Sequence, residues 1–119
     1  MRKFQELSIW QKSHSLCLEI YMITSKFPKD ELYGLTSQMR RSASSIPTNV
    51  AEGCGRSTDA DFKRFLTMAA GSSSELEYQL ILAKDLRFLN DEQFISLSKN
   101  VIEIRKMIYS FSSKLSPRT

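Results

Sequence analysis

Apolar residues recur at steps of three and four along four stretches of this 119-residue chain, and no stretch shows the sustained alternation of a half-buried strand. Residues three and four positions apart share one face of a helix, so the pattern predicts an all-α protein. Breaks at Pro28, at Gly53 and Gly55 and at Asn90 separate the stretches. We expect helices over about residues 5–27, 30–53, 58–89 and 91–115, within a single domain that spans residues 1–119.

Individual positions refine the predicted helices. Pro47 should bend the second helix, because a proline inside a helix removes one backbone hydrogen bond at a cost of about 3 kcal/mol. The third helix should begin after Ser57 or Thr58 as N-cap, and the small residues at 71–74, starting with Gly71, should mark its tightest helix crossing. The fourth helix carries a seam of apolar residues at Phe94, Leu97, Val101, Ile104, Ile108, Phe111 and Leu115. Residues 116–119 should form a frayed tail.

The connections between these helices are short, which makes neighbouring helices antiparallel. The sequence therefore predicts an antiparallel, up-down-up-down four-helix bundle. A chain this short buries only a modest core, so an apolar face left over would favour pairing with other copies of the chain.

Composition narrows the class of protein. The balance of 17 Lys and Arg against 13 Asp and Glu gives a net charge of +4, which favours encounters with anions such as phosphate backbones. Two cysteines are too few for a disulfide scaffold, and the first residues lack the apolar region of a signal peptide, so we expect a cytoplasmic protein. No run of apolar residues is long enough to predict a membrane span, and no contact with a membrane is expected.

Catalytic and metal-binding signatures are missing from the sequence. His14 is the only histidine, and with Cys17 one turn further on it falls short of the four ligands of a structural zinc site. We expect both residues on the packed face of the first helix. The nucleophile-elbow, Walker and zinc-protease motifs are absent as well, so we predict no enzymatic activity and no cofactor.

A polar line follows the second helix beside its apolar stripe. The line consists of Gln38, Arg41, Ser45, Asn49 and Glu52, which recur at helical steps. One interpretation is a solvated face. Serine and asparagine are poor helix formers on an exposed surface, so a hydrogen-bonded network or a subunit contact is an equally good interpretation. A catalytic carboxylate at Glu52 has the least support.

The segment from Gly53 to Arg56 leads into the third helix and is a candidate anion site. Backbone N–H groups, the helix dipole and the Arg56 guanidinium would together hold a phosphate, although glycines at such a turn more often serve only as a helix C-cap. Packing of the helices would add further cations, giving a candidate nucleic-acid-binding edge of Arg40, Arg41, Arg56, Lys63 and Arg64. The alternative is that Glu52, Asp59 and Asp61 neutralise this edge.

A set of spaced positions between about Phe4 and Leu89 forms a pattern that a known family shares. These positions are residues 7–12, Phe27, Pro28, Glu31, Gly34, Leu35, Gln38, Arg40, Arg41, Ser45, Ile46, Pro47, Asn49, Ala51, Glu52, Gly53, Gly55, Arg56, Phe62, Phe65, Leu66, Ala69, Gly71, Ser72, Glu75 and Leu76. In these positions the chain resembles the bacterial four helix bundle protein family. This family is also called the intervening-sequence protein family, after reading frames inside large-subunit ribosomal RNA genes. Residues 90–119 match only as a generic amphipathic helix.

The resemblance implies a four-helix protomer that assembles into a homopentamer and has no assigned enzymatic activity. Relatives include the accessory variability determinant proteins of diversity-generating retroelements, which form basic pentamers, associate with a reverse transcriptase and bind nucleic acid. Two hypotheses follow from the resemblance. In the first, a ring of subunits repeats the basic edge and binds RNA or DNA through phosphates. In the second, the bundle is a protein-interaction scaffold or an accessory subunit of a nucleic-acid enzyme such as a reverse transcriptase.

Overall fold

A computed structural model describes residues 2–116, and within this range the chain forms four α-helices and no strand. The helices are α1 (Ser8–Thr24), α2 (Ser37–Cys54), α3 (Asp59–Asp85) and α4 (Asp91–Ser113). A 3-10 turn, η1 (Phe4–Glu6), precedes α1, and η2 (Lys29–Glu31) and the π-helical turn η3 (Leu32–Thr36) precede α2. The predicted all-helical class is confirmed. Of the frayed tail expected at residues 116–119, Ser116 donates its backbone N–H to Asp59 Oδ2 at 2.9 Å, and residues 117–119 lie outside the described residues.

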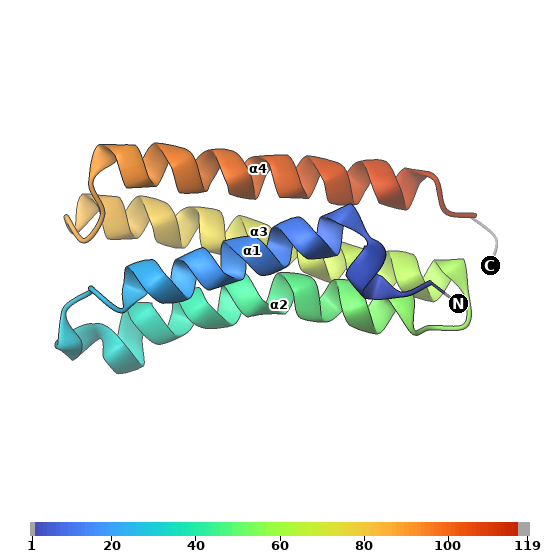
Figure 1. Ribbon diagram of the computed structural model, residues 1–119, viewed down its shortest axis with the longest axis horizontal. Helices are drawn as coiled ribbons and strands as arrows, with labels where there is room; N and C mark the ends of the chain where they lie inside the picture. Colours follow the sequence, from blue (N-terminus) through green and yellow to red (C-terminus); the bar gives the residue numbers. More distant parts are fainter. Residues whose placement is uncertain (1, 117–119) are drawn as a thin grey trace.

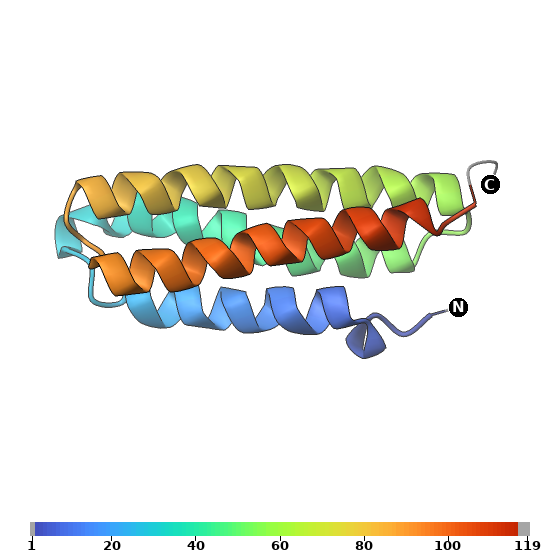
Figure 2. The same cartoon turned by 90° about the horizontal axis from the view of Figure 1, so that it is seen from above.

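The helices lie along a rod of 46 × 23 × 20 Å. Figures 1 and 2 show the chain crossing the rod once with each helix, and each helix packs mainly against the helices next to it in sequence. The contact between α1 and α4 is the least extensive of those that close the bundle. One end of the rod carries the N-terminal segment, the α2–α3 turn and the end of α4, and we call it the N-terminal end. The other end, the far end, carries the α1–α2 and α3–α4 connections.

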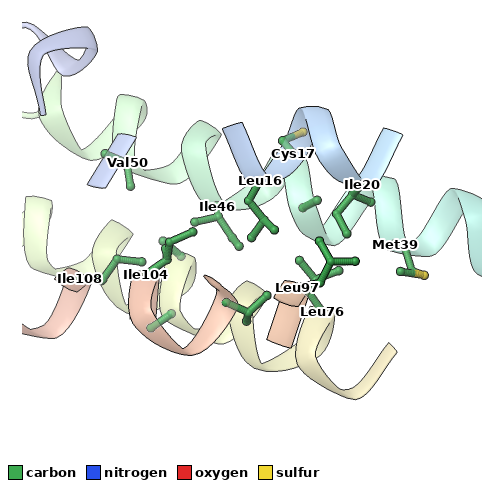
Figure 3. Packing of buried hydrophobic residues seen from close by; sticks show 14 of the residues in the cluster. Leu16, Cys17, Ile20, Met39, Ile46, Val50, Leu76, Leu97, Ile104 and Ile108 are labelled. Carbon is green, nitrogen blue, oxygen red and sulfur yellow. The ribbon is translucent and has the colours of Figure 1, made fainter. Parts of the chain in front are cut away.

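All four helices contribute apolar side chains to one core. Figure 3 shows side chains from the four helices meeting along the axis of the rod. The residues with less than 2% exposure include Leu16, Ile20, Met39, Ile46, Val50, Leu66, Leu76, Leu80, Leu97, Val101 and Ile108. Phe27 and Phe88 close the core at the far end, with their ring centroids 5.4 Å apart. Burial of apolar surface on this scale is the main force that holds the helices together.

The second helix begins later than the sequence pattern suggests. It was expected from about residue 30, but α2 starts at Ser37 because Gly34 adopts a non-helical conformation (φ −113°, ψ −116°) between η2 and α2. The Glu31 side chain accepts a hydrogen bond of 3.1 Å from the backbone N–H of Leu35 and so caps the start of the continuous helix. Leu32, which lies three residues before the buried Leu35, is 46% exposed.

The expectation about Gly71 needs correction. Gly71 is exposed, and a Cβ atom added there would meet nothing within 4 Å, so this residue does not mark the tightest crossing. Among the glycines the closest approach is at Gly53, where an added Cβ would lie 2.7 Å from Cδ1 of Phe62 and 2.9 Å from Cβ of Phe65. Pro47 is buried inside α2, which continues on both sides of it, and the bend expected there stays a prediction.

Specific hydrogen bonds cap both ends of α3 and the start of α4. Thr58 is the N-cap of α3 and accepts a hydrogen bond of 3.1 Å from the N–H of Asp61, as predicted. The helix ends at Asp85 rather than near residue 89, because Arg87 adopts φ 65° and the N–H groups of Arg87 and Phe88 bond back to the carbonyls of Lys84 and Ala83. Asn90 and Gln93 then form a capping box that starts α4.

The first helix presents His14 differently from the expectation. Cys17 is buried, as expected, but His14 is exposed and stacks on the ring of Trp10 at a centroid distance of 4.8 Å. His14 is therefore a surface residue and not a member of the packed face.

Among the described residues, no helix combines the length and apolarity that a membrane crossing requires.

Candidate functional site

The middle of the polar line on α2 faces α3 and forms a hydrogen-bonded seam. Asn49 donates from Nδ2 to the carbonyl oxygen of Ser45 at 2.8 Å and to its hydroxyl at 3.0 Å. Ser72 on α3 donates to the same Ser45 hydroxyl at 2.8 Å. This part of the line is thus engaged in a contact between helices of one protomer, which corresponds to the network interpretation.

Glu52, at the end of the line, lies outside this seam. It is exposed, and its carboxylate is 3.5 Å from the Arg56 guanidinium in an ion pair one helical turn along the chain. Its solvent exposure and ordinary surface pairing give no support to a catalytic carboxylate at this position.

At the other end of the line, a polar hollow lies between α2 and α3. The hollow has a volume of about 310 Å³, and its walls are Gln38, Arg41, Ser42, Glu75 and Gln79. Ser42 donates a hydrogen bond of 2.8 Å to Glu75 Oε1. Gln79 is only 5% exposed, and no hydrogen bond reaches its Oε1 atom.

Four residues of the seam and the hollow were not among the candidate site residues of the sequence analysis, namely Ser42, Ser72, Glu75 and Gln79. A signal for them was present, since Ser72, Glu75 and Gln79 follow one another on α3 at the same three-and-four spacing as the polar line on α2. The partners are not evident from either helix alone, because they depend on how α2 and α3 are aligned.

The predicted basic edge is divided in the structure. Arg40 lies at the contact between α1 and α2. Its guanidinium packs over the ring of Tyr21, 4.7 Å from the ring centroid, and donates a hydrogen bond of 2.9 Å to Thr24 Oγ1. Arg41 lines the polar hollow. Both precede Arg56 by about four turns of helix, roughly 22 Å along the axis, so they do not join Arg56, Lys63 and Arg64 in one patch. The expectation of a single edge of five cations was wrong.

The remaining predicted cations lie at the α2–α3 turn. The guanidinium groups of Arg56 and Arg64 each lie 4.5 Å from the ring centroid of Phe65. Asp61 is 2.9 Å from Arg64 and 3.7 Å from Arg56, so part of this positive charge is neutralised. The pairing leaves 44% of the Arg56 side chain and 59% of the Arg64 side chain exposed.

Part of the expected backbone cradle for a phosphate is used within the turn. The N–H groups of Gly55 and Arg56 donate to the carbonyls of Glu52 and Gly53, each at 3.1 Å. These two N–H groups close the end of α2 and are not free to bind an anion, which is the C-cap alternative.

Folding brings further cations next to this turn from distant parts of the sequence. The Cys54 thiol donates to the carbonyl oxygen of Arg2 at 3.1 Å and holds the N-terminal segment over the turn. The Arg2 guanidinium lies 5.7 Å from the ring of Phe62 and 5.6 Å from that of Phe111. We call the cations on the N-terminal segment, the α2–α3 turn, the first turns of α3 and the end of α4 the basic end, and they are Arg2, Lys3, Arg56, Lys63, Arg64 and Lys114. Nearby carboxylates are Glu6, Glu52, Asp59 and Asp61.

Comparison with known proteins places the chain in a family. The sequence model of a family described as 23S rRNA-intervening sequence protein matches residues 5–110. The chain belongs to this family. A protein of unknown function from the S23 ribosomal protein family of Bacteroides thetaiotaomicron, known from its crystal structure, is 26% identical. The alignment covers 89% of this chain and 99% of that one, with a TM-score of 0.80. Comparison with curated proteins gives no match.

The match to the 23S rRNA-intervening sequence protein family reaches into α4, beyond the part of the chain that carried the resemblance. It includes the interhelical seam, the polar hollow and half of the basic end, namely Arg56, Lys63 and Arg64. The two cysteines of this family member offer no activated nucleophile, since burial raises the pKa of both the Cys17 and the Cys54 thiols.

Proposed function

We propose that this protein is a non-enzymatic, self-assembling helical bundle that binds nucleic acid through phosphates at its basic end. The observation that carries the proposal is the convergence of Arg2 with Arg56 and Arg64 at one end of the rod. Side chains from three separate parts of the sequence supply positive charge there, and much of it is exposed to solvent. Cations of this kind bind a phosphate backbone without reading base sequence.

The proposed assembly is a homopentamer of up-down-up-down protomers. The resemblance to the intervening-sequence protein family supports the stoichiometry. The exposed face of α3 supports an interface between copies, because it carries Met68, Tyr78 and Ile81 at 42–61% exposure together with Gly71. A glycine in the middle of an exposed helix costs about 1 kcal/mol relative to alanine, and no contact within the protomer requires it. In a ring, each basic end would be repeated, which raises the affinity for a long polyanion.

The nucleic-acid proposal is tested by fluorescence anisotropy with a structured RNA, a DNA duplex and an RNA–DNA hybrid over a range of salt concentrations. We expect affinity to fall steeply as salt rises, because binding releases counterions. Arg56→Glu/Lys63→Glu/Arg64→Glu should abolish binding. Lys26→Glu/Lys29→Glu/Arg87→Glu makes the same change in net charge at the far end and should leave most of the binding intact. Equal losses in the two triple variants would argue against the basic end as the binding surface.

A protein-interaction scaffold, or an accessory subunit of a nucleic-acid enzyme, is the second candidate function. Exposed apolar side chains toward the far end favour it, since Tyr33 is 94% and Met22 71% exposed, and Leu18 and Tyr21 lie beside Met22 on α1. Apolar surface of this kind is typical of protein contacts. Absence of binding to all three nucleic acids at low salt would favour this function over the first.

A further inference from the structure

A groove runs along the side of the rod where α1 and α4 face each other. It consists of two hollows of about 290 and 270 Å³, which share Glu19 as a wall residue. From Gln11 to Ile23 the groove follows α1 for about 18 Å. Since α1 and α4 make the least extensive of the four contacts that close the bundle, the protomer fills this side less than the others.

The groove has an apolar base and a negative rim. Three buried side chains line its base, namely Leu16, Leu97 and Ile104. At the rim, Lys12 and Glu103 neutralise each other in an ion pair of 2.7 Å. Glu19 and Glu92 are exposed and form no ion pair with the described residues. The groove therefore carries a net negative charge, although the whole chain has a charge of +4.

The neighbouring side of the rod carries a ridge of apolar side chains on α4. Ile95, Ile102 and Tyr109 are spaced by seven residues and so share one face of the helix. Ile95 is 63% and Tyr109 59% exposed, and Ile102 is partly exposed. This face lies toward α3, because Arg105, one turn after Ile102, donates hydrogen bonds to side chains of α3. The ridge is about 21 Å long, which is close to the length of the groove.

The charges beside the ridge are opposite to those at the groove. Lys99 and Lys106 alternate with the ridge residues along α4, are exposed and form no ion pair with the described residues. The ridge and the groove therefore complement each other in length, in apolar character and in charge. Because both belong to the same chain, this complementarity points to a second copy as the partner.

We propose that the ridge of one copy inserts into the groove of the next copy, so that every copy uses two different faces. The proposal rests on the proposed self-assembly and does not depend on nucleic-acid binding. Figure 2 shows α4 between α3 and α1, so the groove and the ridge lie on neighbouring sides of the rod. A repeated contact between unlike faces on neighbouring sides closes into a ring of few copies, whereas faces on opposite sides would build an open filament.

Light scattering of the full-length protein tests the contact with two blocked variants. Ile95→Glu/Ile102→Glu places negative charge on the ridge, and Ser15→Trp/Ser96→Trp fills both hollows of the groove. These positions are exposed or partly exposed, so both variants should keep the helical circular dichroism of the wild type. Each variant alone should have the 13.7 kDa mass of one chain. An equimolar mixture should form a complex of two chains and nothing larger, because one variant keeps the ridge and the other keeps the groove.

Leu32→Glu/Tyr33→Glu is the matched control, since it makes the same kind of change at two exposed apolar residues of the far end. It should leave the mass of the wild type unchanged. A mixture of the two blocked variants that stays monomeric, or a ridge variant with the mass of the wild type, would overturn the contact. An oligomeric wild type would then still support self-assembly through another face. A wild type that is itself monomeric would contradict both, and salt-sensitive RNA binding would in that case still support the basic end.

A charge exchange gives a second readout of the same contact. Glu19→Lys/Glu92→Lys makes the groove positive, and Lys99→Glu/Lys106→Glu makes the ridge negative. At low salt, each pair of substitutions alone should lower the mass, because like charges then meet in the contact. All four substitutions in one chain should restore the oligomer. Damage to the protomer itself would not be repaired in this way, and failure of the four-fold variant to assemble would contradict the proposed pairing of the two faces.

Discussion

Gly53 lies against Phe62 so closely that a Cβ atom on the glycine would be 2.7 Å from Cδ1 of the ring. The same Cβ would be 2.9 Å from Cβ of Phe65, which is fixed to the α3 backbone and cannot rotate away. This contact sets how closely the end of α2 approaches the start of α3, and it therefore positions the turn that carries Arg56.

We expect Gly53→Ala to lower the free energy of unfolding by about 1–3 kcal/mol, the usual cost of overpacking a filled core. The helices must move apart by several tenths of an ångström to accept the methyl group. Urea denaturation measures the change. Gly55→Ala is the control, because an added Cβ there would come no closer than 3.5 Å to another atom. A Gly53→Ala variant as stable as wild type would contradict the close packing.

Gly71, unlike Gly53, has free space around its Cα atom, and a substitution there tests the proposed assembly. Leucine at this position meets no atom of the protomer within 4 Å of its Cβ, so Gly71→Leu should keep the helical circular dichroism of the wild type. If the α3 face is buried between copies, the larger side chain should lower the mass measured by light scattering toward the 13.7 kDa of one chain. A variant of unchanged mass that is more stable by about 0.5–1 kcal/mol would show that this face is simply exposed helix.

Arg87 occupies a backbone conformation that suits glycine. Its φ of 65° lies in the left-handed region, where a residue with a Cβ atom costs about 1–2 kcal/mol more than glycine. Arg87→Gly should therefore raise the free energy of unfolding by about 1 kcal/mol, as measured by thermal and urea denaturation. Asp85→Gly, two residues earlier within α3, should lower it. Equal effects at the two positions would argue against the turn as described.

The ion pair between Lys12 and Glu103 links α1 to α4 at 2.7 Å. The hydrogen bond from Lys12 is the main cause that lowers the pKa of the Glu103 carboxyl. Because this pKa is lower in the folded than in the unfolded chain, the contribution to stability is present above the unfolded pKa and is lost as pH falls through the folded one. Both side chains are about half exposed, so we expect that contribution to be small.

An NMR titration of the Glu103 carboxyl carbon would report this pKa directly. Lys12→Met should return the Glu103 pKa close to its ordinary value. Lys99→Met should raise it less, because Lys99 acts only through weaker charge attraction. A larger effect from Lys99 than from Lys12 would contradict the assigned ion pair.

Local patterns in the sequence predicted the parts of the fold that depend on neighbouring residues. The three-and-four spacing located the α-helices because it reflects which side chains share a helix face. The chemistry of Ser57 and Thr58 narrowed the N-cap of α3 to these two residues, and the structure shows Thr58 in this position. The same reasoning failed where the backbone departs from a helix. Leu32 and Leu35 have helical spacing, but the conformation of Gly34 turns Leu32 toward solvent.

For the candidate sites as well, the sequence predicted contacts between residues close along the chain but not contacts between different helices. The sequence by itself determined that Ser45 and Asn49 border the core, because they recur at helical steps beside the apolar stripe. It also determined that Arg56 and Arg64 are near each other, because only a short turn and the first turns of α3 separate them. Only the tertiary structure decided that Ser72 meets Ser45, that Arg40 is separated from Arg56 and that Arg2 joins the turn. These relationships depend on the alignment of one helix against another, which is set by the fit of side chains such as Phe62 against Gly53 and leaves no periodic trace in the sequence.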